Sequence, residues 1–209
     1  MKTLLRIDAS ARVDTSYSRS LADYVEKAWK QQNSEHQVIY RDLAKTLIPH
    51  LQQNTIEGFY TPQEQMTSAM KDVLAISDEL ISELLEADEI LISSPLYNLN
   101  VPSGLKAYLD QVVRIGHTFE TGEGGVHQGL LKNKTAYLVL AKGGSYRGTL
   151  YEAFDFQEPY LKAILQYIGI KPQAVFSLEG TSDQDTLQRN LPNLYQQIDT
   201  IFQTQPQIL

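Results

Sequence analysis

The stretch that decides the fold class is EILISSPLYNLNVPSGLKAYLDQVV, residues 89–113. An apolar run typical of a buried strand ends at Ser93-Ser94-Pro95, and an amphipathic pattern typical of a helix begins after Pro102. Pro102 suits a first helical turn, because the N–H that it lacks would have no helical partner there. We therefore expect a strand over 89–95, then a short loop on the rim of a sheet, then a helix.

The same alternation of strand and helix runs along the chain. Further strands are expected at 3–9, 36–43, 135–141 and 173–179. Helices are expected from about Ser18, over 63–86, over 152–168 and near the C-terminus, where Pro192 should break or restart the helix. This alternation predicts a parallel sheet with helices on both faces. Five strands fit a flavodoxin-like, doubly wound α/β sheet better than a barrel, which needs eight units.

The composition excludes several classes of protein. The 209 residues include 18 Lys and Arg against 25 Asp and Glu, a formal net charge of −7. Nucleic-acid binding needs a cationic surface, so this charge argues against it. The absence of cysteine excludes disulfides, thiolate catalysis and cysteine-ligated metal. No apolar run has the length of a signal segment or a membrane span, and we expect a cytoplasmic protein.

We expect residues 1–209 to form a single domain, since no linker or repeat divides them. The stretch 44–62 is long and irregular for a compact domain. Two interpretations of it remain open: a segment that is functional or packed on a partner, and a tolerated surface excursion. Phe59 and Tyr60 in this stretch are candidates for contacts with a partner's site.

Residues 8–20 follow the first strand and carry several hydroxyl groups. The hydroxyl groups of Ser10, Thr15, Ser16 and Ser18 lie where the next helix exposes free backbone N–H groups, an arrangement that favours a phosphate. Ordinary N-capping by Ser16 or Ser18 is the alternative. The glycine patterns of P-loops and of dinucleotide folds are absent here, which disfavours both of those sites.

Two more strand ends offer groups for a flat ring, since ligands of open parallel sheets bind at the carboxyl ends of strands. In the rim loop 96–100, backbone groups and the Asn98 amide could bond the edge of a heterocycle that Tyr97 covers, unless this tyrosine only packs locally. After the strand 135–141, Gly143-Gly144 permits close approach to a ligand or a positive φ, or makes a simple tight turn. The three strand ends together favour a planar cofactor that bears a phosphate.

The remaining candidates have less specific patterns. Residues 115–129 contain five glycines and form either a ligand-shaped segment or a flexible surface loop. The histidines at 36, 50, 117 and 127 lack metal-ligand spacing, so we expect no metal site. Ser145 lacks a G-x-S-x-G setting, which disfavours hydrolytic chemistry.

Three motifs resemble those of one family: SSPLYNLNVPSGLKAYLDQVVRIGHTF, DASAR…SYSR and LAKGGSYRG. They are similar to the FMN-dependent NADH azoreductases of the flavodoxin-like superfamily, also described as NAD(P)H:quinone oxidoreductases. The resemblance runs along nearly the whole chain, and its block from Pro95 to Asp110 is specific. Leu96 and Leu99 stand where the family often has Met and Phe, and Ala141-Lys142 replaces its Ser-Arg.

The resemblance implies a set of FMN-binding positions. The phosphate loop corresponds to Ser10, Ser16, Tyr17 and Ser18. The ring-lining segment corresponds to Pro95, Leu96, Tyr97, Asn98 and Leu99. The second flavin loop corresponds to Ala141, Lys142, Gly143, Gly144 and Tyr146. Lys142 keeps the cation of the family's arginine but lacks its bidentate fork.

The resemblance further implies an oxidoreductase with one FMN per subunit, in a homodimer that has the flavin at the subunit interface. NADH or NADPH would reduce the flavin, and a quinone or azo compound would then be reduced in a ping-pong reaction. We expect no catalytic side chain, because the flavin carries the chemistry. The alternatives are an electron carrier or regulatory FMN module without a substrate of its own, and a non-redox binder of a phosphate ligand.

Overall fold

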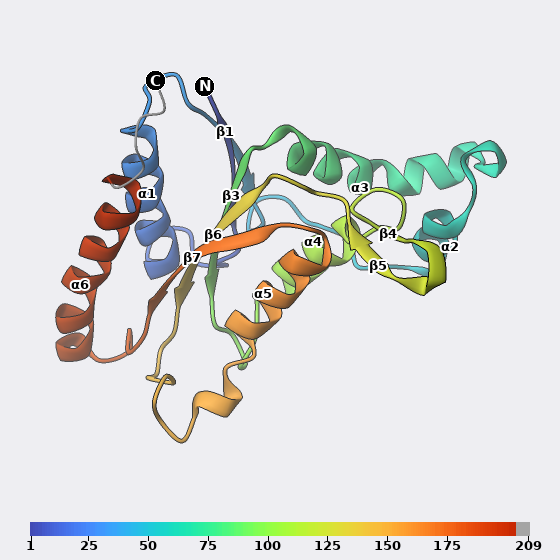
Figure 1. Ribbon diagram of the computed structural model, residues 1–209. Helices are drawn as coiled ribbons and strands as arrows, with labels where there is room; N and C mark the ends of the chain where they lie inside the picture. The colour runs from blue at the N-terminus through green and yellow to red at the C-terminus, as the bar shows by residue number, and fades with distance from the viewer. Residues whose placement is uncertain (204–209) are drawn as a thin grey trace.

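The structure, a computed structural model, describes residues 1–203. A five-stranded parallel sheet forms its centre, with the spatial order β2-β1-β3-β6-β7 (Figure 1). Its strands are β1 (Thr3–Asp8), β2 (Gln37–Asp42), β3 (Glu89–Pro95), β6 (Thr135–Ala141) and β7 (Lys171–Leu178). The expected doubly wound parallel sheet is thereby confirmed.

Helices cover both faces of the sheet (Figure 1). One face carries α1 (Tyr17–Lys30) and α6 (Gln184–Gln203), which lie side by side. The other face carries α3 (Ser68–Glu86), α4 (Ser103–Val112) and α5 (Gln157–Tyr167). None of the helices within residues 1–203 is long and apolar enough to cross a membrane.

Each central strand contributes side chains to two hydrophobic cores, because successive side chains of a strand point to opposite faces. In β1, Leu4 packs with α1 and α6, whereas Leu5 packs into the cluster that includes α3, α4 and α5. Leu91 and Ile92 of β3 divide in the same way. Burial on both faces explains why these strands are nearly continuous apolar runs in the sequence.

The C-terminal helix corrects one prediction. Pro192 neither breaks nor restarts the helix: α6 is a single element from Gln184 to Gln203 with Pro192 inside it. The side chains of Leu187 and Leu194, on either side of the proline, are both buried against the sheet. Packing of this apolar face outweighs the one backbone hydrogen bond that the proline removes.

Two expected helices begin later than predicted. A 3₁₀ turn at Gln63–Gln65 precedes α3, whose N-cap Thr67 accepts a hydrogen bond from the Met70 N–H at 3.2 Å. A second 3₁₀ turn at Glu152–Phe154 precedes α5. At α5 the N-cap Phe156 makes no such bond, and the Asp155 carboxylate accepts from Gln157 N at 3.1 Å instead. Polar side chains that bond the backbone in this way are a signal that apolar periodicity does not contain.

The two irregular stretches contain short regular elements. The stretch 44–62 includes the helix α2 (Gln53–Tyr60), which packs on α3, so the description of it as irregular was wrong for these residues. The glycine-rich segment 115–129 folds back as an antiparallel pair, β4 (Phe119–Thr121) and β5 (His127–Gly129). A 3₁₀ turn at Glu123–Gly125 joins the two strands.

Candidate functional site

The carboxyl ends of β1, β3 and β6 meet at one edge of the sheet. In register, Asp8 is level with Ser93, and Pro95 is level with Ala141. The backbone pairing extends past the strand ends, since Leu96 N donates to Ala141 O at 2.8 Å. Strand order reverses between β1 and β3, and ligands of open α/β sheets bind outside the strand ends at such a point. The loops after these three strands therefore form the candidate site.

The loop between β1 and α1 brings together the predicted phosphate residues. Ser10, Ser16 and Ser18 are all buried, and the Ser16 and Ser18 hydroxyl oxygens lie 3.1 Å apart. Ser16 is the N-cap of α1, and its hydroxyl accepts from Arg19 N at 3.4 Å, so the capping interpretation holds for Ser16. The backbone N–H groups of Tyr17 and Ser18 form no hydrogen bond within the described residues. Free amides at a helix N-terminus fit an anion such as a phosphate.

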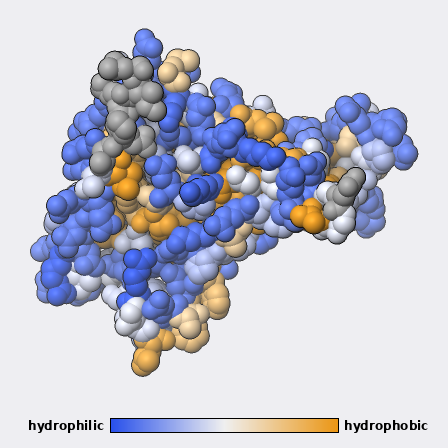
Figure 2. Space-filling model, in the orientation of Figure 1, coloured by the Kyte–Doolittle hydropathy of each residue, from blue (hydrophilic) through white to orange (hydrophobic). Residues whose placement is uncertain are grey.

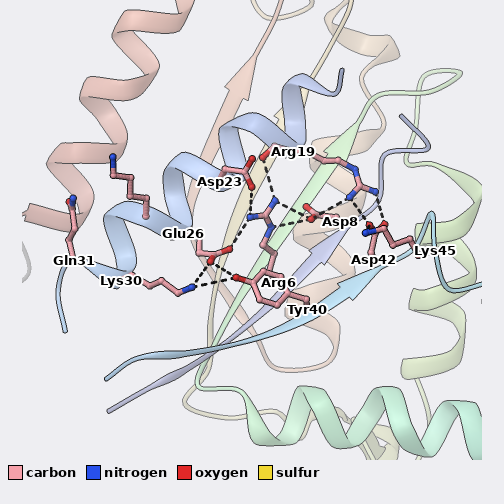
Figure 3. Close-up of a pocket in the computed structure, with 11 residues that line it drawn as sticks. Arg6, Asp8, Arg19, Asp23, Glu26, Lys30, Gln31, Tyr40, Asp42 and Lys45 are labelled. Carbon is pink, nitrogen blue, oxygen red and sulfur yellow. Dashed lines mark hydrogen bonds and ion pairs between the residues drawn. The ribbon is translucent and has the colours of Figure 1, made fainter. Parts of the chain in front are cut away.

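A buried ion network lies beneath this loop and was missed from the sequence (Figure 3). The Arg19 guanidinium donates from Nη2 to Ser10 O at 2.8 Å and to Asp42 Oδ1 at 2.6 Å. The buried Arg6 pairs with Asp8 at 3.1 Å and with Glu26 at 2.9 Å. Arg19 thereby connects the loop between β1 and α1 to the end of β2. The position of Arg19, directly after Ser18 in the SYSR motif, was the one signal that could have indicated this role.

Burial and ion pairing have opposite effects on the pKa values of the carboxylates in this network. Burial alone would raise the pKa of Asp42, but the Arg19 hydrogen bond and charge outweigh it, so the pKa of Asp42 lies below its ordinary value. The pKa of Glu26 is lowered as well, because its bonds to Lys30, Tyr40 and Arg6 outweigh burial. A cavity of about 710 Å³ opens beside these groups. Since its buried charges are already paired with one another, we interpret the network as support for the loop between β1 and α1.

The rim loop after β3 is a tight turn. Tyr97 and Asn100 exchange backbone hydrogen bonds of 2.9 and 3.0 Å across it. Asn98 and Leu99 between them have φ of 48° and 71°. Positive φ at both central residues defines a type I′ turn, which normally takes Asn-Gly. Leu99 is therefore held in a strained conformation, and strain of this kind is concentrated at functional sites.

The turn presents side chains to the outside of the sheet edge. Asn98 and Leu99 are exposed, whereas Leu96 and Tyr97 are half-buried. The Asn98 amide forms no hydrogen bond within residues 1–203, so it is free to bind a ligand. Leu99 O accepts from Phe156 N at 3.1 Å, which fixes the turn against the segment before α5.

The Gly143-Gly144 loop after β6 is anchored by its carbonyl groups. Gly143 O accepts from Ser182 N at 3.1 Å, and Gly144 O accepts from Gly180 N at 3.1 Å. The N–H groups of Gly143, Gly144 and Ser145 have no hydrogen-bond partner in the described part of the chain. Neither glycine has a positive φ, so that predicted role is wrong. A Cβ added at Gly143 would lie 2.9 Å from Ser182 Oγ, so close packing within the protein already favours glycine there. Close approach to a ligand stays a prediction, and a simple tight turn stays its alternative.

Tyr146 lies next to this loop. Its backbone N–H donates to Glu179 Oε2 at 2.7 Å, and its side chain is half-buried. A Cβ added at Gly144 would lie 3.6 Å from Tyr146 Cε2, so the ring flanks the glycine. The loop therefore combines free backbone donors with an aromatic ring, groups that suit the edge and the face of a flat cofactor.

Lys142 has surroundings that the sequence did not indicate. Its side chain is 1% exposed, and Nζ bonds Asp155 Oδ2 at 2.5 Å and Glu179 Oε1 at 3.2 Å. The ammonium group thus lies inside the protein, between two carboxylates, and does not face the rim. A direct contact of Lys142 with a cofactor remains a prediction from the family motif.

Two of the four histidines, His36 and His127, pack against aromatic rings, whereas His50 and His117 are exposed. The His127 ring stacks on Tyr167 with a centroid distance of 3.7 Å, and its Nε2 lies 2.6 Å from Tyr167 O. His36 lies against Trp29. Over residues 1–203, His, Asp and Glu side chains form no group of three that could hold a metal ion.

The fold and the sheet edge together define the class of protein. Three loops meet at the switch point of the parallel sheet, whose order is β2-β1-β3-β6-β7. The free N–H groups at the start of α1 lie on one side of this point, and those of the Gly143-Gly144 loop lie on the other. The sequence profile described as flavodoxin-like fold matches residues 1–201. The chain belongs to this family.

The named relatives are more specific than the fold. A protein from Xanthobacter autotrophicus named FMN-dependent NADH:quinone oxidoreductase is 47% identical over 174 residues, which cover 82% of this chain and 83% of the relative. The FMN-dependent NADH:quinone oxidoreductase 1 of Trichormus variabilis is 43% identical over 167 residues, covering 80% and 79%.

Solved structures agree in fold. The azoreductase from Bacillus anthracis str. Sterne superposes with a TM-score of 0.88 at 23% identity, over 97% of this chain and 99% of that one. An FMN-dependent NADH-azoreductase from Bacillus anthracis str. Ames Ancestor, solved in complex with FMN, has a TM-score of 0.84 at 24% identity, over 96% and 98%.

Proposed function

We propose that this protein is an FMN-dependent NADH:quinone oxidoreductase that also reduces azo compounds. One observation carries the proposal: the buried serines and free amides at the start of α1 share a sheet edge with the rim loop and the Gly143-Gly144 loop. A phosphate-bearing flat cofactor needs both kinds of contact, an anion site and a planar slot with backbone donors. The names of relatives up to 47% identical support FMN, NADH and quinone as the three reactants.

The described residues fit FMN in two parts. The phosphate would be held by Ser10, Ser16, Tyr17 and Ser18. The ring would be held by the segment Pro95–Leu99 and by Ala141, Gly143, Gly144 and Tyr146. Lys142, whose ammonium lies between Asp155 and Glu179, would support this loop from inside the protein. When bound, FMN supplies hydride acceptance from NADH and electron transfer to the acceptor.

The chain contributes binding, orientation and charge stabilisation. The free N–H groups of Gly143, Gly144 and Ser145 are preorganised donors for negative charge on a ring edge, and they cost no reorganisation. The Asn98 amide is a second polar group for that edge. Proton donation by a side chain is not required in this scheme, since water reaches the exposed rim. We infer a ping-pong order, with donor and acceptor using one open face in turn.

Turnover tests the proposal against the rival classes. The protein loaded with FMN should oxidise NADH in the presence of a quinone far faster than the same concentration of free FMN. Parallel double-reciprocal lines across quinone concentrations would support the ping-pong order. A yellow protein without this turnover would instead be an electron carrier, and a protein that fails to quench FMN fluorescence would be a binder of another phosphate ligand. Replacing NADH by NADPH in the same assay identifies the preferred donor.

We further propose a homodimer with the flavin site at the subunit interface. The segment between β6 and α5 exposes apolar side chains, which gather at the lower tip of the molecule (Figure 2). Leu150 is 96% exposed, Tyr151 64% and Phe156 51%. This patch adjoins the rim loop, because Phe156 N bonds Leu99 O. Clustered apolar exposure of this kind is typical of an interface.

The oligomeric state can be measured directly. Light scattering after size exclusion should give twice the chain mass of 23.6 kDa, and Leu150→Glu should shift the protein toward the monomer. A monomer at micromolar concentration would contradict the dimer and leave the flavin proposal standing.

We further propose that residues 1–209 form a single domain, of which residues 204–209 lie outside the described part. One cooperative unfolding transition would support this proposal.

A further inference from the structure

Asp155 and Phe156 directly precede α5, Gln157 is its first residue, and each of the three contacts a different part of the candidate site. The Asp155 carboxylate accepts from Lys142 Nζ at 2.5 Å, and Lys142 directly precedes the Gly143-Gly144 loop. The Phe156 N–H donates to Leu99 O at 3.1 Å in the rim turn. Gln157 Nε2 donates to Ser94 O at 3.1 Å and to Ser94 Oγ at 3.0 Å, at the end of β3.

Lys142 also connects this arrangement to the end of β7. Glu179, directly after β7, accepts from Lys142 Nζ at 3.2 Å through Oε1. Its other oxygen accepts the N–H groups of Tyr146 at 2.7 Å and Arg147 at 3.1 Å. One buried ammonium therefore fixes both the carboxylate that holds the Tyr146 backbone and the carboxylate at the start of α5.

The burial of these groups makes the arrangement rigid. Lys142 is 1% exposed and Gln157 is fully buried, so neither bond competes with water. Asp155 also accepts from Gln157 N at 3.1 Å through Oδ1, which fixes the orientation of its carboxylate. The Gln157 Oε1 atom is the exception, since it is buried and has no hydrogen-bond partner within the described residues. The bonds from Lys142 Nζ and Gln157 Nε2 restrict the conformations of the segments that they join.

We propose that Lys142, Asp155 and Gln157 form a positioning network that sets the distance between the rim turn and the Gly143-Gly144 loop. Lys142 is then a positioning residue whose ammonium acts through Asp155 and Glu179. The relevance of this network to FMN rests on the proposed function, whereas its coupling of the two loops does not. The segment 155–157 is the common member, since it bonds both loops.

The network predicts that a change at one loop is transmitted to the other. Lys142→Met removes the bond on the Gly143-Gly144 side, and Gln157→Leu removes the bond on the β3 side. In protein without FMN, each variant should raise the rate of amide hydrogen exchange by about tenfold in both segments, residues 94–100 and residues 142–148. In the double variant the exchange should rise no further than in the more affected single variant, because both changes interrupt one connection.

Two further variants separate positioning from simple stabilisation. Lys142→Arg keeps a cation that can bond both carboxylates, and it should restore exchange close to that of the unmodified protein. Lys106→Met is the matched control, since Lys106 forms a 2.5 Å ion pair with Asp110 on α4 that does not include Lys142, Asp155 or Gln157. It should leave exchange in both segments unchanged.

The cofactor gives a second readout. Lys142→Met and Gln157→Leu should each weaken FMN binding by about tenfold and alter the visible absorption band of bound FMN in the same way. If each substitution loosens only its own loop, or if exchange rises equally throughout α1 and α6, the positioning network is refuted. Should Lys142→Met fail to fold, Gln157→Leu alone decides, because it leaves no unpaired charge. The exchange result holds whether or not the protein binds FMN, so its failure is distinct from failure of the proposed function.

Discussion

Arg19 Nη2 lies 2.8 Å from the carbonyl oxygen of Ser10, and the same guanidinium bonds both carboxylate oxygens of Asp42. This contact joins the loop after β1 to the end of β2 through the first turn of α1. The conformation of the candidate phosphate site therefore depends on a side chain that need not touch the phosphate itself.

Arg19→Met should weaken FMN binding by about tenfold, because the Ser10 loop loses the bond that fixes it. Binding of riboflavin, which has no phosphate, should change little. Arg19→Lys should give an intermediate loss, since lysine keeps the charge without the bidentate fork. Fluorescence titration with both flavins measures the effect, with Lys27→Met on the same helix as control. An unchanged ratio of FMN to riboflavin affinity would contradict the role of Arg19.

Leu99→Gly should be more stable than Leu99→Ala by about 1 kcal/mol, because φ at this position is 71°. Both variants remove the partly exposed side chain, so the comparison isolates the backbone. The I′ turn then has the Asn-Gly sequence that this geometry favours. Urea denaturation of the two variants measures the difference. Equal midpoints would mean that the turn relaxes to another conformation without cost.

Asp42→Asn should destabilise the protein near neutral pH by roughly 1–3 kcal/mol, because Arg19 loses a charged partner. The pKa of Asp42 is lowered in the folded state, so its stabilisation is present above the ordinary aspartate pKa near 4 and is lost as the pH falls through the lower folded value. The difference in the free energy of unfolding between the unmodified protein and Asp42→Asn should therefore decrease in acid. Urea titrations at neutral pH and near pH 3 test this sign; a gap that widens in acid would be incompatible with it.

Pro192→Ala should raise the free energy of unfolding by about 1–2 kcal/mol. Alanine restores the missing amide donor inside α6, and the gain is partly offset by greater freedom of the unfolded chain. Asn193→Ala, a change at the exposed neighbour, is the control and should alter stability by only a few tenths of a kcal/mol. A lower midpoint for Pro192→Ala in thermal denaturation would show that the helix needs the proline.

The sequence by itself determined the parallel sheet and pointed to the edge that carries the candidate site. The apolar runs of β1, β3 and β6 are continuous because each strand is buried on both faces, and this pattern depends only on neighbouring residues. Ser10, Tyr97 and Gly143 could be assigned to one sheet edge because carboxyl ends of parallel strands must meet there. The family motif added the cofactor.

Only the tertiary structure decided which partners the charged and polar side chains near that edge bond. The bonds of Lys142 to Asp155 and Glu179 span 13 and 37 residues, and the bond of Gln157 to Ser94 spans 63. A local pattern cannot contain such partners, because they are brought together by strand order and helix packing. The sequence places a lysine beside the Gly143-Gly144 loop, and the fold buries its ammonium between the carboxylates of Asp155 and Glu179.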